Sequence, residues 1–154
     1  MSISKLTGTS WTSISKVDGV TASGISKVAG VDVPVDYFLD THSSPVAAYS
    51  LRKLSSSATT AITVENSSGT TLDIGFDSSG NLDTSALTTH CGSNYGRVSK
   101  WWDQSGNNRH MEQSTAASRP YIVDNSGNVL TTTDNSITAL NFYFQSTARW
   151  LEDT

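Results

Sequence analysis

A six-residue unit occurs three times within the first thirty residues, and this repeat is the strongest constraint on how the chain can fold. Ile-Ser-Lys-Leu-Thr-Gly starts at residue 3, Ile-Ser-Lys-Val-Asp-Gly at residue 14 and Ile-Ser-Lys-Val-Ala-Gly at residue 25. Each unit alternates apolar and polar residues and stops at glycine, which predicts short strands. The period of about 11 residues is shorter than in common solenoids, whose units have about 20 to 50 residues. Such strands build no core, so they must lie against something else.

Residues 1–36 are therefore interpreted as an arm that docks during assembly. Strand addition would supply main-chain hydrogen bonds, while apolar side chains fill pockets on the neighbour. The residues expected to make these contacts are Ile3, Leu6, Ile14, Val17, Ile25 and Val28. Residues 37–154 are expected to form a separate β-sandwich module, either complete or the leading part of a longer domain.

The composition and the turn signals predict an all-β fold. Ser and Thr make up roughly 30% of the chain, far above average usage, while charged residues are only 16%. Turn signals recur every 8 to 15 residues or so, as in a concanavalin-like or jelly-roll sandwich. Strands are predicted at 61–65, 71–76, 97–103, 120–123 and 139–144. One or two short helices are added: one capped by Ser44 with Pro45 at its first position, and one capped by Asp83.

Several classes of function are not favoured by the sequence. The net charge is −4 and the 10 Lys and Arg residues are scattered, so no basic surface for nucleic acid is expected. No apolar run approaches membrane-spanning length, and the N-terminus has no hydrophobic signal core. Cys91 is expected to be a small buried hydrophobic residue. The three histidines show no metal-ligand spacing, and no cofactor or metal is expected.

The segment that follows Trp101 and Trp102 has two interpretations. As a glycan-contact loop it would use Trp101, Asp103, Gln104, Asn107 and Asn108, because an aromatic face and polar groups suit a sugar. As a tight turn, its Asp would accept from backbone amides two residues on. Adjacent residues in a strand face opposite ways. Trp102 is expected to be the core member of the pair, since Val98 shares its parity.

The loop at 77–83 also has two interpretations. Its oxygen-bearing side chains suit Ca²⁺, but Ser79 stands where the EF-hand pattern needs Asp or Asn. The alternative is a loop that ends in a helix cap.

Two stretches carry a resemblance to a known family. They are Ala47–Leu54 with Asp73-Ile74-Gly75-Phe76-Asp77 and Leu82-Asp83-Thr84, and Trp101-Trp102-Asp103-Gln104-Ser105-Gly106-Asn107-Asn108. Together they resemble the front half of the catalytic domain of fungal α-L-arabinofuranosidase B enzymes, a concanavalin-like sandwich. The chain also resembles bacteriophage virion proteins that share this module and begin with Ile-Ser-Lys-Val-x-Gly units.

The resemblance implies a virion protein, tail-associated or of the fibre type, whose arm docks on neighbouring subunits. Its partners would be other virion proteins and a host-surface glycan, and a homo-oligomer, for example a trimer, is expected. Because the family's catalytic carboxylates belong to the later half of the domain, no catalytic residue is carried over and a non-enzymatic chain is expected. The alternatives are a head decoration protein of the same build, or a truncated glycoside hydrolase-like enzyme of the arabinofuranosidase type.

Overall fold

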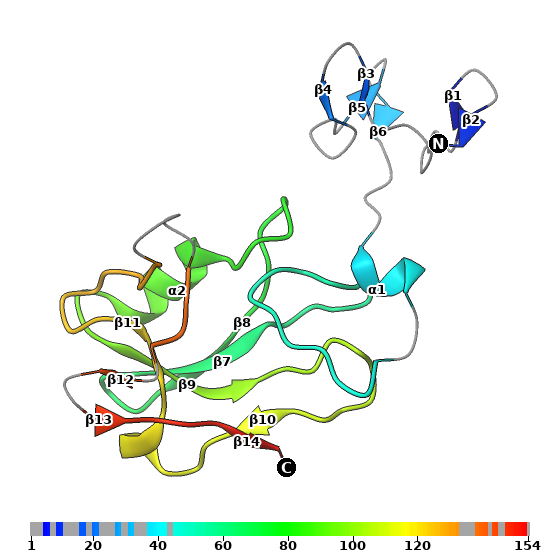
Figure 1. The fold of residues 1–154 in the computed structure, drawn as a ribbon. Helices are drawn as coiled ribbons and strands as arrows, with labels where there is room; N and C mark the ends of the chain where they lie inside the picture. Colours follow the sequence, from blue (N-terminus) through cyan, green and yellow to red (C-terminus); the bar gives the residue numbers. More distant parts are fainter. Residues whose placement is uncertain are drawn as a thin grey trace. The chain divides into compact units, whose positions relative to one another are not determined.

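A computed structural model of the chain divides into two compact units, Met1–Asp36 and Tyr37–Thr154. It describes residues 37–42, 45–132, 138–141 and 149–152 in full. Of residues 143–144, 147–148 and 153, and of the strands in the first unit, only the backbone is described. Figure 1 shows the ribbon. Whether the first unit serves as an assembly arm stays a prediction.

In the first unit each repeat forms its own small antiparallel hairpin. β1 (Lys5–Leu6) pairs with β2 (Thr9–Ser10), β3 (Lys16–Val17) with β4 (Val20–Thr21), and β5 (Lys27–Val28) with β6 (Val31–Asp32). The inner pair of each hairpin occupies the equivalent position in its repeat; these pairs are Leu6↔Thr9, Val17↔Val20 and Val28↔Val31. In the sequence, two residues separate the paired strands of each hairpin, and the second of them is glycine, a pattern typical of a two-residue hairpin loop. The isoleucines Ile3, Ile14 and Ile25 lie outside the described residues.

The second unit is built on one antiparallel sheet, which confirms the all-β prediction with short helices. The sheet order is β14-β10-β9-β7-β8, and β11 also pairs with β9; Figure 1 shows these strands side by side. The elements are α1 (Phe38–Thr41), β7 (Ile62–Asn66), β8 (Thr71–Ile74), α2 (Thr84–Cys91), β9 (Gly96–Trp101), β10 (Met111–Glu112), the 3-10 helix η3 (Ala116–Ser118), β11 (Tyr121–Val123), β12 (Tyr143–Phe144), β13 (Thr147–Ala148) and β14 (Glu152–Asp153).

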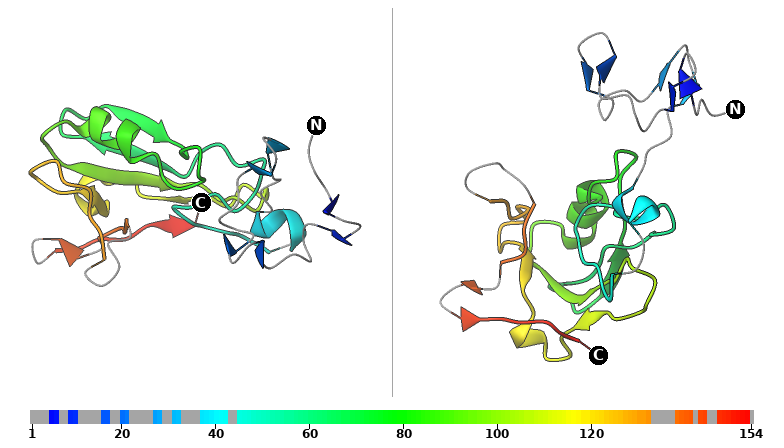
Figure 2. Two further views of the ribbon diagram at one scale, coloured as in Figure 1. Left: turned by 90° about the horizontal axis from the view of Figure 1, so that it is seen from above. Right: turned by 45° about the vertical axis from the view of Figure 1, so that its right-hand side comes forward.

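One face of this sheet carries the core. Ile62, Val64, Ile74 and Val98 are fully buried there, and α2 adds Leu87. The other residues of the cluster are Ala61, Leu82, Cys91, Ile122, Val123 and Leu151. Figure 2 shows α2 lying along the sheet. Because side chains alternate across a strand, the residues between these core positions point to the opposite, polar face.

Five-residue turns of one kind recur along the second unit. Each begins with Asn or Asp, has Ser third and Gly fourth, and its first side chain accepts a hydrogen bond from the backbone N–H of that Ser. The glycines have φ between 78° and 89°, a range that favours glycine over other residues. The turns are 66–70, 77–81, 103–107 and 124–128. The loop at 77–83 is thus a turn that ends in the Asp83 cap, whose side chain accepts from Ala86 N–H at 2.9 Å.

The predicted helix after Pro45 does not form. The segment 45–54 has no helix, and Ser44 lies outside the described residues. Its backbone groups bond to the rest of the unit, with Lys53 N–H donating to the Gly80 carbonyl at 2.7 Å and Ala48 N–H to Asp103 Oδ1 at 2.8 Å. These tertiary bonds replace the local bonds of a helix, so a plausible local signal is overridden by packing.

The prediction that Trp102 is the core member of its pair is wrong. Trp101 packs against the core, while Trp102 donates from Nε1 to Thr63 Oγ1 on the polar face. The register explains why the two tryptophans face the opposite way from the prediction. Lys100 pairs with Thr63 and Val98 with the next residue, Val64, so β9 has one extra residue, Ser99, between its two pairs. The extra residue in β9 is a β-bulge, and a bulge shifts the alternation of side chains by one position.

Candidate functional site

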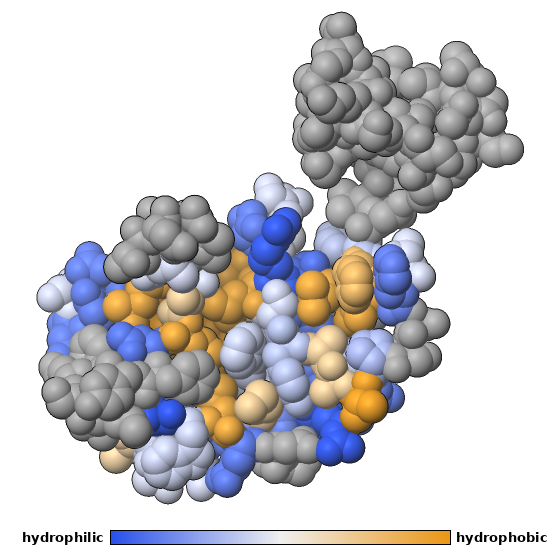
Figure 3. Space-filling model, in the orientation of Figure 1, coloured by the Kyte–Doolittle hydropathy of each residue, from blue (hydrophilic) through white to orange (hydrophobic). Residues whose placement is uncertain are grey.

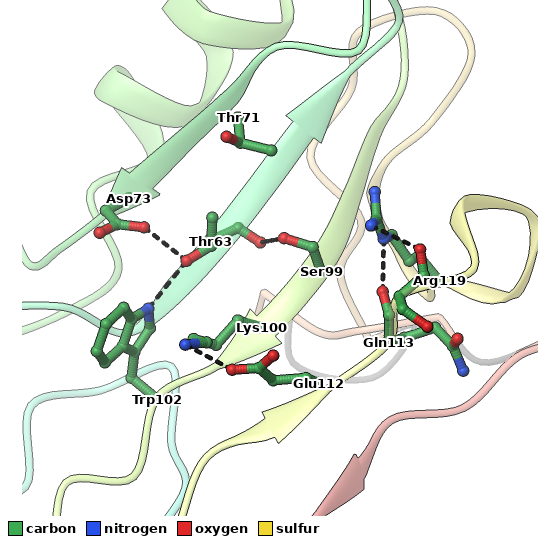
Figure 4. Close-up of a pocket in the computed structure, with 10 residues that line it drawn as sticks. Thr63, Thr71, Asp73, Ser99, Lys100, Trp102, Glu112, Gln113 and Arg119 are labelled. Carbon is green, nitrogen blue, oxygen red and sulfur yellow. Dashed lines mark hydrogen bonds and ion pairs between the residues drawn. The ribbon is translucent and has the colours of Figure 1, made fainter. Parts of the chain in front are cut away.

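A groove of about 350 Å³ lies on the polar face of the sheet. The bulge in β9 helps to build it, because Trp102 is brought to the same side as Lys100 and Thr63. Figure 4 shows this arrangement. The lining residues are Thr63, Thr71, Asp73, Ser99, Lys100, Trp102, Glu112, Gln113, Ser114 and Arg119.

Thr63 is the centre of a short hydrogen-bond chain in the groove. Its hydroxyl donates to Asp73 Oδ1 at 2.5 Å and accepts from Trp102 Nε1 at 2.9 Å. The register places Asp73 directly opposite Thr63 on the neighbouring strand. The chain therefore fixes an exposed carboxylate beside an indole edge.

Two ion-pair clusters flank this chain. Lys100 Nζ lies 2.5 Å from Glu112 Oε1 and 4.6 Å from the centre of the Trp102 ring. Deeper on the same face, the half-buried Arg97 and Arg119 both pair with Glu65. Arg119 also donates from Nε to the Gln113 carbonyl at 2.7 Å. The two arginines and Glu65 hold β7, β9 and the segment before β11 together, so they frame the groove.

The predicted glycan-contact residues lie together, but their polar atoms serve mainly to anchor the segment 45–54. Gln104 accepts from Leu54 N–H at 2.8 Å and donates to the carbonyls of Ser50 and Arg52. Asn107 donates from Nδ2 to the carbonyls of Pro45 and Val46. Trp101 faces the core rather than this loop's surface, and Asn108 is exposed with φ of 57°. A glycan-contact role for the loop stays a prediction.

Asp103 is the central acceptor of this anchor. Its carboxylate accepts from Ala48 N–H, Ser105 N–H, the Ser105 hydroxyl and Arg109 N–H, at 2.7 to 3.2 Å. Burial by itself raises the pKa of Asp103, but these hydrogen bonds outweigh it, so its pKa lies below the usual value. Asp103 is 9% exposed, and the bonds that it accepts hold the turn at 103–107 against the segment 45–54.

Within the described residues, the remaining candidates add no second site. Burial raises the pKa of the Cys91 thiol, which suits an inert core residue. Among the fully described residues, no three His, Cys, Asp or Glu side chains are grouped in a way that would hold a metal ion. The described helices are all too short to cross a membrane. The groove could not be predicted from the sequence because its residues come from four strands, one of them bulged, and from the segments after β9 and β10. Thr63 and Asp73 do stand on the polar side of predicted strands.

Comparison with known proteins finds similarity to two solved arabinofuranosidase structures over less than half of this chain. A GH54 α-L-arabinofuranosidase soaked with a cyclic sulfate inhibitor is 36% identical, with a TM-score of 0.40 over 44% of this chain and 15% of its own. An arabinofuranosidase complexed with arabinofuranosyl-α-1,2-xylobiose is 31% identical, with a TM-score of 0.43 over 49% of this chain and 17% of its own. No protein-family model matches the chain, and no curated protein does.

These matches agree with the predicted resemblance to arabinofuranosidases and correct another expectation. The chain was expected to be non-enzymatic, and the two solved structures named above, which are arabinofuranosidases, contradict that expectation. This chain covers less than a fifth of either solved chain, so the activity of those enzymes is a proposal for this chain.

Proposed function

We propose that the second unit binds a saccharide in the polar groove, as part of a glycoside hydrolase-like protein of the arabinofuranosidase type. The observation that carries the proposal is the chain Asp73–Thr63–Trp102, which holds a carboxylate beside an indole on an open sheet face. Sugars present hydroxyl donors and acceptors around apolar C–H faces, and such a mixed surface suits them.

Asp73 is the expected anchor for a sugar hydroxyl. Glu112 is paired with Lys100, and Glu65 with two arginines. Among the described residues, Asp73 forms no ion pair, and its Oδ1 accepts a hydrogen bond from the Thr63 hydroxyl. An ionised carboxylate with a second oxygen turned to solvent accepts strongly from hydroxyl donors.

The charges in the groove balance. Lys100 and Arg119 offset Asp73 and Glu112, which suits an uncharged sugar. Hydrolysis of a glycosidic bond needs two carboxylates that face the sugar. Asp73 and Glu112 both line the groove and supply two carboxylates. Saccharide binding and hydrolysis are therefore both measured on each variant described below.

The test uses Asp73→Asn, with Asp77→Asn in the adjacent exposed turn as the matched control. The probes are arabinofuranosyl-α-1,2-xylobiose, the ligand of one similar structure, for binding and an aryl α-L-arabinofuranoside for hydrolysis. A charge-assisted hydrogen bond contributes about 1.5–3 kcal/mol, so Asp73→Asn should weaken binding at least about tenfold. Asp77→Asn should bind like the parent. Equal binding by Asp73→Asn, or no binding by the parent chain, would overturn the proposal.

A second candidate function rests on the first unit, and it is the virion role that the resemblance implies. Each repeat folds as a hairpin of two residue pairs. An isolated two-stranded hairpin is marginally stable in water at best. Three consecutive hairpins are therefore expected to be stabilised by packing against another surface. The proposal is a tail-associated or fibre-type subunit, with head decoration as the alternative position. An antibody against residues 37–154 should label purified phage particles, and unlabelled particles would refute this role.

A further inference from the structure

A row of cross-strand neighbours runs across the polar face of the main sheet from one end to the other. Its members are directly opposite one another in the register of successive strands, in the order Asp73, Thr63, Lys100, Glu112 and Glu152. Residues directly opposite each other in antiparallel strands project from the same face. The first four line the groove, as Figure 4 shows. Glu152 therefore continues the line of the groove onto β14, the last strand of the sheet.

The row is longer than a single sugar. Neighbouring strands lie about 4.8 Å apart, so a row across five strands is roughly 19 Å long. A sugar ring is comparable in width with one strand spacing, so a row of this length matches about four sugars in line. The groove volume of about 350 Å³ lies within the usual range of ligand pockets, about 300–1,000 Å³. These dimensions suit an oligosaccharide better than a monosaccharide.

Hydrogen-bonding groups are available along the whole row. It contains no apolar side chain, although apolar residues do reach the surface on the face that Figure 3 shows. The exposed Thr71 and Ser114 also line the groove, and within the described residues neither hydroxyl has a hydrogen-bond partner. Hydroxyls and carboxylates can each bond to the hydroxyls of a sugar.

The end of the row at β14 carries an unusual pair of charges. Glu112 and Glu152 lie directly opposite each other, and like charges in such positions destabilise a sheet. Lys100 pairs with Glu112, whereas Glu152 is exposed and has no ion-pair partner in the part of the chain that the structure describes. Hydroxyl donors from a ligand would offset this repulsion, because an ionised carboxylate accepts strongly from them. Local features that cost stability are expected where a protein binds a ligand.

We propose that the groove binds an oligosaccharide of about four sugars laid across the strands, from Asp73 at one end to Glu152 at the other. This inference rests on the saccharide-binding function proposed above, and it adds the length and the direction of the ligand. Asp73 anchors the first sugar and Glu152 the last, while the sugars between them lie over Thr63 and Lys100.

The test measures dissociation constants of the full chain by isothermal titration calorimetry with probes of increasing length. The probes are methyl α-L-arabinofuranoside, arabinofuranosyl-α-1,2-xylobiose and arabinofuranosyl-α-1,2-xylotetraose. Each step adds two sugars and at least two hydrogen bonds, so the dissociation constant should fall at least about fivefold per step.

Glu152→Gln tests the far end of the row. The change keeps the size of the side chain and removes its charge, and a charge-assisted hydrogen bond is about twice as strong as a neutral one. The variant should bind the longest probe at least about threefold more weakly and methyl α-L-arabinofuranoside like the parent chain. Asp77→Asn, in a turn outside the groove, is the control and should bind every probe like the parent chain. Circular dichroism melts show whether each variant is folded.

The outcomes separate this inference from the proposed function. Equal dissociation constants for the three probes, or unchanged binding of the longest probe by the folded Glu152→Gln variant, would overturn the inference and leave sugar binding at Asp73 intact. Failure of the parent chain to bind any of the three probes would overturn the proposed function itself.

Discussion

Replacement of Asp103 by Asn should destabilise the second unit through the anchor of segment 45–54. The change keeps the size of the side chain, but one carboxylate oxygen becomes an NH₂ group. Oδ1 accepts from Ala48 N–H and Ser105 N–H, and Oδ2 from the Ser105 hydroxyl and Arg109 N–H. Two donors therefore lose their acceptor whichever way the Asn amide is turned.

The expected loss follows from these four bonds. A hydrogen bond to a charged group contributes about 1.5–3 kcal/mol, so two lost bonds cost roughly 3 kcal/mol at the lower end. The free energy of unfolding of a whole domain is about 5–15 kcal/mol. With roughly 4 °C per kcal/mol for a unit of this size, the Tm should fall by about 12 °C. Differential scanning calorimetry at neutral pH measures it.

Asp124→Asn is the matched control. Asp124 begins the same kind of turn and accepts from the backbone N–H groups of Ser126 and Asn128. Its turn is largely exposed, and bonds at exposed positions contribute little. The control should lose less than about 1 kcal/mol. Similar losses for the two variants would contradict the buried-anchor argument.

The effect of Asp103→Asn should also depend on pH. The pKa of Asp103 is lowered in the folded chain, so its carboxylate stabilises the fold fully above the unfolded pKa of about 3.9. This contribution is lost as the pH falls through the folded pKa. The Tm difference between parent and variant should therefore shrink in acid, and an equal difference in acid and at neutral pH would refute the argument.

Two further pairs of variants test the core and the turns. Trp101→Ala should cost roughly 3–5 kcal/mol of unfolding free energy, whereas Trp102→Ala should cost less and weaken saccharide binding; equal Tm losses would contradict the bulge assignment. Gly69→Ala should cost about 1 kcal/mol because φ is 81° with open space around it. Gly127→Ala should cost more, since its new Cβ would lie 2.5 Å from the Gly92 carbonyl oxygen; denaturant unfolding compares the two.

Local features of the fold could be predicted where the signal lies within a few residues. Alternation predicts the strands 61–65 and 71–76, where β7 and β8 lie, and the short apolar run at 120–123 predicts a further strand, where β11 lies. Asp83 caps α2 as expected. The Asx turns follow from Asn or Asp with Gly three residues on, because the side chain and the glycine backbone meet the geometry without help from distant residues.

Features that depend on distant residues could not be predicted. The side chains of Asp103 and Gln104 accept hydrogen bonds from backbone N–H groups of segment 45–54, which therefore does not form a helix. The partners are about 50 residues apart in the sequence, so no local pattern predicts this contact. The bulge at Ser99 is likewise set by the pairing of β9 with β7 and β10. It reverses the roles of Trp101 and Trp102, which strict alternation assigns the other way.

The sequence alone determined the repeats, the alternation of β7 and β8 and the recurring turns, because each depends on the backbone preferences of neighbouring residues. Only the tertiary structure decided the groove. Thr63, Asp73, Lys100 and Trp102 come from three strands and the residue after β9, and they meet because of strand order and one shifted register. A register is fixed by the sum of contacts across the sheet, so it becomes known only when all the partners are in place.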